Sequence, residues 1–115
     1  MVKGLEKVVS VPRGSVVTLG KVEGDLHVAD GATIKAEDSK QVIVSGIVRC
    51  EGDCTFECGL SADSIRGRGG EVNVKGDLSI ERSVRIERGS LIVEGNLSAN
   101  KTEVDGKLID GVQNN

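Results

Sequence analysis

The sequence predicts an all-β fold, a single-stranded parallel β-helix (solenoid) of about five to six short triangular coils. Three observations favour it: one short motif recurs along the chain, apolar residues alternate with a period of two over long stretches, and aromatic residues make up 1% of the sequence. A core of small and β-branched side chains needs no aromatics, whereas most globular cores use several. At 115 residues, one domain is expected.

The repeated motif reads apolar-x-Gly-x-Leu-x-apolar. Its close copies are Val22-Glu-Gly-Asp-Leu-His-Val28, Val74-Lys-Gly-Asp-Leu-Ser-Ile80, Val93-Glu-Gly-Asn-Leu-Ser-Ala99 and Val104-Asp-Gly-Lys-Leu-Ile-Asp110. Looser copies are Val44-Ser-Gly-Ile-Val-Arg-Cys50 and Cys58-Gly-Leu-Ser-Ala62. In Val93–Ala99 we expect one face of a coil, with its apolar residues inward.

The chain divides into three parts. Residues 1–15 are predicted to form an N-terminal entry strand or a cap over the open end of the core, and they end in a turn after Pro12. Residues 16–110 are predicted to form the β-helix. Residues 111–115 are polar, so we expect a frayed tail. The tail holds no obvious closing cap, so the sequence is consistent with a fragment of a longer protein.

In the first half of the β-helix, alternation begins at Val17 and is punctuated by Asp30-Gly31, a strong turn signal. The polar stretch Glu37–Gln41 is the best candidate for a protruding loop. From Val42 to Ala62 every apolar residue but Ile43 and Ile47 has an even number, which indicates β structure with one buried side. So long a strand is rare, so we expect Gly46, Gly52 and Gly59 to mark corners or bends.

In the second half, Arg66-Gly-Arg-Gly-Gly70 interrupts the alternation and is predicted to be a loop or wide turn. Alternation resumes at Val72 and continues to Leu108. The motif glycines lie at positions 24, 46, 76, 95 and 106, so their spacing is uneven. A three-faced coil of about 18 residues explains this spacing. The interval from 24 to 46 is then one turn plus an insertion at 37–41, and the interval from 46 to 76 is one and two thirds of a turn. The intervals from 76 to 95 and from 95 to 106 are one turn and two thirds of a turn.

Composition and charge limit the classes of function. The 15 basic and 18 acidic residues are mixed along the chain, with a net charge of −3, which argues against nucleic-acid binding. No apolar run has the length of a membrane span or a signal-peptide core. We therefore expect a cytoplasmic protein without an integral membrane segment.

The motif copies at Val22–Val28, Val74–Ile80 and Val93–Ala99 resemble the coil signature of the bactofilins, polymer-forming cytoskeletal proteins. The resemblance covers roughly residues 16–108. It implies a right-handed triangular β-helix that assembles end to end into filaments without nucleotide and acts as a scaffold for other proteins. The expected partner is therefore the protein itself, as a homo-oligomer or filament, with other proteins as further partners.

No residues are predicted to be catalytic, cofactor-binding or metal-binding. Cys50, Cys54 and Cys58 share the parity of the core residues and lack a Cys-x2-Cys pair, so core packing is preferred over a metal or redox site. The Arg66–Gly70 segment is read as a surface loop rather than an anion-binding nest or an RGG element. His27 should point outward and has no partner of ligating type.

An enzyme is not expected. A hexapeptide-repeat acyltransferase needs a regular six-residue aliphatic repeat and a histidine in a protruding loop, and pectin-lyase-like enzymes use larger coils. The two hypotheses that stay open are a self-associating structural protein and a monomeric binding module that presents a charged face or the loops at 37–41 and 66–70.

Overall fold

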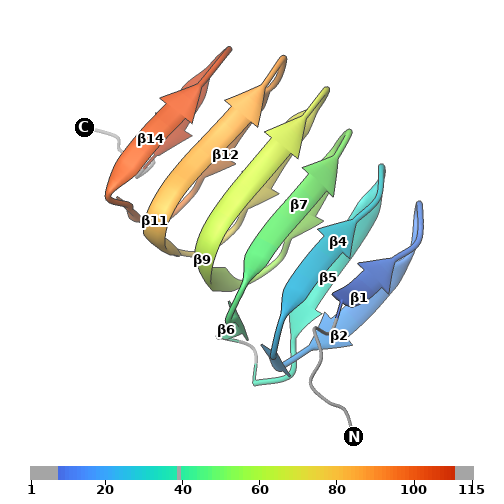
Figure 1. Cartoon of the computed structure of the whole chain (residues 1–115). Helices are drawn as coiled ribbons and strands as arrows, with labels where there is room; N and C mark the ends of the chain where they lie inside the picture. Colours follow the sequence, from blue (N-terminus) through green and yellow to red (C-terminus); the bar gives the residue numbers. More distant parts are fainter. Residues whose placement is uncertain (1–7, 39, 111–115) are drawn as a thin grey trace, which may run out of the picture.

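The fold is a β-solenoid of about six turns, in which parallel strands stack coil upon coil (Figure 1). The computed structural model describes residues 8–38 and 40–110, and within them it contains strands and no helix. The predicted fold class is confirmed. No helix in this part of the chain is long and apolar enough to cross a membrane.

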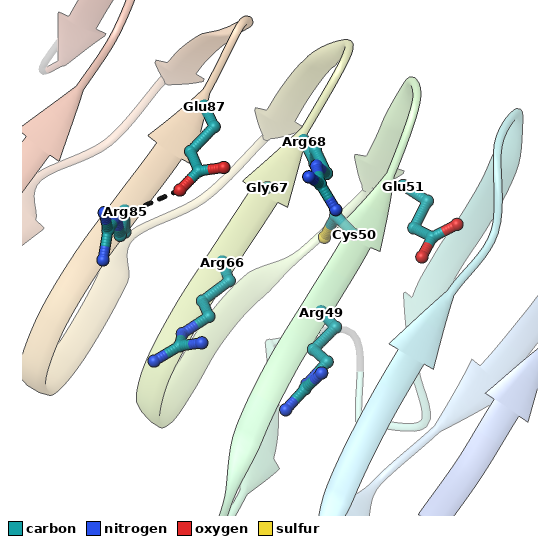
Figure 2. A pocket seen from close by; sticks show the side chains of 8 residues that line it. All are labelled: Arg49, Cys50, Glu51, Arg66, Gly67, Arg68, Arg85 and Glu87. Atoms are coloured by element: carbon teal, nitrogen blue, oxygen red, sulfur yellow. Dashed lines mark ion pairs between the residues drawn. The ribbon is translucent and has the colours of Figure 1, made fainter.

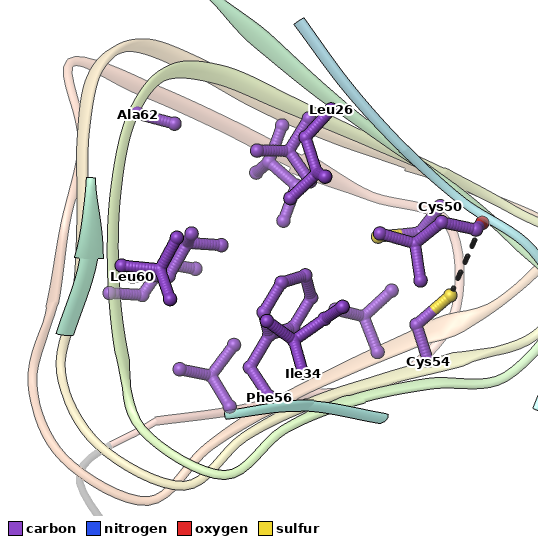
Figure 3. Close-up of a cluster of buried hydrophobic side chains, with 14 of the residues drawn as sticks. Leu26, Ile34, Cys50, Cys54, Phe56, Leu60 and Ala62 are labelled. Atoms are coloured by element: carbon purple, nitrogen blue, oxygen red, sulfur yellow. Dashed lines mark hydrogen bonds between the residues drawn. The ribbon is translucent and has the colours of Figure 1, made fainter. Parts of the chain in front are cut away.

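Each coil has three faces, which give the triangular section seen in Figure 3. Face 1 contains β1 (Val8–Val11), β4 (Asp25–Val28), β7 (Ile47–Glu51), the second halves of β9 (Gly59–Arg68) and β11 (Leu78–Glu87), and β14 (Lys101–Val104). Face 2 contains β2 (Val16–Leu19), β5 (Ala32–Ala36), β8 (Cys54–Phe56), β10 (Glu71–Val74), β12 (Ser90–Val93) and β15 (Leu108–Asp110). Face 3 contains β3 (Lys21–Val22), β6 (Gln41–Val44), the first halves of β9 and β11, and β13 (Leu97–Ser98).

The strand register confirms the coil length read from the glycine spacing. Val48 pairs with Ile65 and Ile65 with Val84, and both steps are close to the predicted coil of about 18 residues. Leu26 pairs with Val48, which is a longer step. This longer coil carries the extra residues between β5 and β6, where the loop at 37–41 was predicted; Gln41 already belongs to β6.

The core is one column of apolar side chains along the axis (Figure 3). The even-numbered apolar residues from Val42 to Ala62 are all buried, as their parity predicts. Phe56, the one aromatic residue, is fully buried in the middle of the column. At Ser64 and Ile65 the chain passes the corner inside β9, and the inward positions change from even to odd numbers.

The repeated motif crosses a corner, which corrects the expectation that it forms one face. In the copy at 93–99, Val93 ends β12 on face 2, and Leu97 begins β13 on face 3. Val93 is fully buried, while Leu97 and Ala99 pack partly buried against the core. Gly95 lies at the corner, where an added Cβ would come within 2.8 Å of the Gly76 carbonyl oxygen.

The segment Arg66–Gly70 is not the predicted loop. Its first three residues complete β9, and only Gly69 and Gly70 turn. Gly67 occupies an inward position, where an added Cβ would lie 2.7 Å from Ile86 Cδ1 and 3.1 Å from Val72 Cγ2. Gly67 therefore leaves room for core side chains, although a glycine between two arginines is typical of a loop.

The β-helix begins earlier than the expected boundary at residue 16. Strand β1 lies inside the predicted entry segment and pairs in parallel with β4, so this segment contains an entry strand, the first of face 1 among the described residues. The Pro12–Ser15 turn forms, with the Ser15 N–H donating to the Pro12 carbonyl at 3.2 Å. The expected frayed tail, 111–115, lies outside the described residues, as do residues 1–7 and 39.

Glycines at the corner between faces 1 and 2 allow adjacent coils to approach. An added Cβ at Gly70 would lie 2.7 Å from the Asp53 nitrogen and still closer to the carbonyl of Gly52. Rigid backbone of the next coil blocks this Cβ, so Gly70→Ala should lower the free energy of unfolding by about 1–3 kcal/mol. Denaturant unfolding monitored by circular dichroism measures this change.

The control for Gly70→Ala is Gly69→Ala. Gly69 has a φ of +75° but open space around its Cβ position, so alanine meets only the left-handed backbone cost of about 1–2 kcal/mol. A loss at Gly70 smaller than the loss at Gly69 would contradict the close approach of the coils.

Candidate functional site

The outward side chains of face 1 form a row that runs along the solenoid axis. The strand register aligns His27 with Arg49, Arg49 with Arg66, and Arg66 with Arg85. Ser10 and Glu103 are the rungs at the two ends. We call Arg49, Arg66 and Arg85 the arginine ladder; adjacent rungs lie on strands about 4.8 Å apart.

Most of these arginines have no acidic partner. Arg85 pairs with Glu87 at 3.3 Å and with Glu103 at 4.0 Å, and its side chain is 57% exposed. Among the described residues, Arg49, Arg66 and the nearby Arg68 form no ion pair within 4.0 Å. Like charges directly opposite each other on neighbouring strands are unfavourable. The ladder therefore lacks the opposite-charge pairs that would stabilise neighbouring strands.

A shallow groove of about 170 Å³ lies beside the arginine ladder (Figure 2). One side is the ladder, and the other side is a second outward row, Glu51, Arg68 and Glu87. Cys50 and Gly67 also line it, and because their positions face the core, the floor is strand backbone. Four arginines against two glutamates give the groove a net charge of +2 (4 − 2), although the whole chain carries −3.

Further depressions continue along face 1 on both sides of the groove. One is lined by His27, Arg49 and Glu51 among others, and another by Arg66, Arg85 and Glu103 among others. His27 points outward, as predicted, and the register adds what the sequence did not show, a place next to the arginine ladder.

Face 2 shows how the same fold arranges outward charges for stability. At the end of this face, the row Lys35, Glu57, Lys75 and Glu94 alternates in sign; Lys35 lies in β5, and the other three directly follow β8, β10 and β12. The row contains ion pairs of 3.9 Å (Lys35 Nζ to Glu57) and 3.8 Å (Lys75 Nζ to Glu94). The side chains of both pairs are about half exposed, so each pair adds little. The absence of alternation in the arginine ladder is thus a property of face 1 and not of the fold.

The ladder was not predicted from the sequence, although Arg66, Arg68 and His27 were considered as candidates. Arg49 and Arg85 were counted only among the mixed charges. The signal was available, because positions 49, 66 and 85 are separated by intervals that are each close to one coil. Placing 66–70 in a loop removed Arg66 from the register and hid the alignment.

The three cysteines belong to the core, as their parity predicts. All are buried and free, and Cys54 Sγ donates to the Val28 carbonyl at 3.7 Å (Figure 3). A hydrogen bond with Cys54 and burial raise the pKa of the Cys50 thiol well above its ordinary value of 9.0. Burial, and then the charges of Asp38 and Glu57, raise the pKa of Cys58. In the described part of the chain, no group of three or more His, Cys, Asp or Glu side chains could hold a metal ion.

These thiols should therefore react slowly in the folded protein. We expect a colorimetric disulfide reagent at pH 8 to modify the thiols only after denaturation, when all three cysteines react.

Because the folded state raises the pKa of Cys50 and Cys58, their protonated forms stabilise the fold fully below about pH 9. This contribution falls as the pH rises further, so thermal unfolding should shift to lower temperature above that pH. Rapid modification of the native protein would contradict the burial.

Asp38 holds the connection between β5 and β6, where the loop at 37–41 was predicted. Asp38 Oδ1 accepts hydrogen bonds from the N–H groups of Lys40 at 2.8 Å and Gln41 at 3.2 Å. These bonds hold the pKa of the exposed Asp38 carboxyl below its usual value. The described residues of this connection, Glu37, Asp38 and Lys40, lie between β5 of face 2 and β6 of face 3, whereas Arg66 and Arg68 lie on face 1, so these residues do not form one site with the arginines.

When the chain is compared with models of protein families, with curated proteins and with solved structures, none of them matches it.

Proposed function

We propose that this protein is a structural protein of the bactofilin type, which self-associates through the ends of its β-helix into oligomers or filaments and serves as a scaffold, with the cytoplasm as its location. The observation that carries the proposal is the condition of the two end coils. In the described part of the chain, their outer strand edges have no partner, and their inward apolar side chains lie in the same arrangement that holds the inner coils together.

At the N-terminal end, β1 pairs only with β4 and β2 only with β5 among the described residues. Val16 on β2 is 61% exposed, and the inward-facing Val9 and Val17 are only partly buried. At the C-terminal end, β15 pairs only with β12 in the same part of the chain, and Leu108 and Ile109 are 42% and 40% exposed. Unpaired strand edges of this kind pair readily with another chain.

The test uses inward and outward positions of the same end strands. Leu108 pairs in register with Leu91 of the core, while its equally exposed neighbour Ile109 points outward. At the other end, Val17 faces inward and Val16 outward. A lysine inward on the end coil would prevent an added coil from stacking, whereas an outward lysine would leave the stacking surface intact.

We therefore expect the wild-type chain to form concentration-dependent oligomers in analytical ultracentrifugation and rods in negative-stain microscopy. Val17→Lys or Leu108→Lys should weaken association at least about tenfold, since each removes apolar contact and adds a charge to the joint. Val16→Lys and Ile109→Lys should leave it nearly unchanged. A strictly monomeric wild-type protein at high concentration would overturn the proposal and favour the monomeric binding module. Greater sensitivity at the outward positions would overturn end-to-end joining in favour of side-by-side contact.

A further inference from the structure

We propose that the arginine ladder of face 1 is a docking site for an acidic segment of a partner protein, whose carboxylates lie in a row parallel to the solenoid axis. The site consists of Arg49, Arg66 and Arg85, together with the groove between them and the row containing Arg68. In this inference the function of face 1 does not depend on how the ends of the β-helix associate.

The arginine ladder lacks charge alternation when no ligand is bound. Arg66 lies between Arg49 and Arg85 in strict register, and neither Arg49 nor Arg66 has an acidic partner among the described residues. A sequence selected for stability alone would alternate charges here, as the row from Lys35 to Glu94 does on face 2. A bound row of carboxylates would supply the missing alternation.

The spacing of the ladder matches a row of side chains on a helix. Residues three or four positions apart on a helix form a row with a rise of about 4.5–6 Å per step. Adjacent rungs of the ladder lie about 4.8 Å apart, so Arg49 and Arg66 can each meet one carboxylate of such a row, with Arg85, which already pairs with Glu87 and Glu103, at its end. Guanidinium groups bind carboxylates through two parallel hydrogen bonds, which makes arginine suited to this pairing.

The groove is asymmetric in charge, which favours a peptide over other anions. Glu51 and Glu87 lie on the side opposite the ladder, so a uniformly charged polymer filling the groove would also meet two carboxylates. A peptide can present carboxylates on one side and hydrogen-bond donors on the other. Single-stranded nucleic acid also needs aromatic platforms for its bases, and the one aromatic residue, Phe56, is fully buried.

The probe is an acetylated, amidated, alanine-based helical peptide with glutamates in one i, i+3, i+7 row. An isomer of the same composition, with its glutamates spread around the helix, tests whether the row matters. Isothermal titration calorimetry with the full chain at low salt should show the row peptide binding at least about tenfold more tightly than the isomer. Equal binding of the two peptides would overturn the inference.

The variants separate the ladder from bulk charge. Arg49→Gln/Arg66→Gln and Lys35→Gln/Lys75→Gln each remove two positive charges from exposed rows on different faces. The arginine variant should weaken binding of the row peptide at least about tenfold, and the lysine variant less than about threefold. Similar losses in both would show nonspecific attraction and overturn the site.

Two further measurements complete the test. Arg66→Glu converts the ladder to alternating charges, so it should unfold at the same temperature as the wild type or a higher one, while its binding of the row peptide is lost. A clear drop in unfolding temperature would overturn the argument from repulsion.

Tighter arginine-dependent binding of single-stranded DNA or of anionic phospholipid vesicles than of the row peptide would show that the partner is not a protein. Sedimentation of the arginine variant should match the wild type, so failure here is distinguishable from failure of end-to-end association.

Discussion

Replacing Phe56 with alanine is expected to lower the free energy of unfolding by about 3–5 kcal/mol. Phe56 is the largest fully buried side chain, and it lies on β8 in register between Ile34 and Val74 of the adjacent coils. No other aromatic residue exists to fill the space. The strands around it are held by hydrogen bonds to the coils above and below, so they can close only part of the cavity.

Chemical denaturation monitored by circular dichroism measures this loss, with Phe56→Leu as the control. Leucine keeps most of the apolar volume, so its cost should be about 1–2 kcal/mol. A solenoid is stabilised coil by coil, and Phe56 lies in a middle coil. The alanine variant is therefore also expected to unfold less cooperatively, with a broader transition. Equal losses for alanine and leucine would show that the core around Phe56 collapses freely.

The architecture was predictable because each coil repeats the same alternation of inward apolar and outward polar residues. The parity of Val42 to Ala62 indicated an inside and an outside, and the glycine spacing gave the coil length that the register confirms. Both signals arise from local chemistry that is visible in the sequence. The boundary at residue 16 was placed too late because β1 is a short strand, and too few apolar positions precede Pro12 to establish alternation.

The candidate site was less predictable, because it depends on register between coils. Arg49, Arg66 and Arg85 are far apart in sequence, and only exact coil lengths align them. Those lengths differ from one coil to the next, so a small error in any of them would move an arginine to the inward side. Gly67 added to the difficulty, since a glycine between two arginines resembles a loop while its true role is to make room for Ile86.

The neighbours Val48 and Arg49 test the inward and outward assignment within one strand. Val48 is fully buried on β7, in register between Leu26 and Ile65, whereas Arg49 points into solvent. An aspartate at position 48 would place a carboxylate in an apolar core without a partner. We expect Val48→Asp to cost about 3–5 kcal/mol or more, a large part of the stability of a small domain.

Arg49→Asp introduces the same side chain one position away. It should lower the free energy of unfolding by no more than about 0.5 kcal/mol, or raise it, because it removes a like-charge contact with Arg66. Thermal unfolding at two pH values sharpens the comparison. Burial raises the pKa of a carboxyl group, so the deficit of Val48→Asp should shrink as the pH falls towards about 4 and the new side chain takes up a proton. A deficit that is the same at both pH values, or a comparable loss in Arg49→Asp, would contradict the assignment of Val48 to the core and Arg49 to the open face.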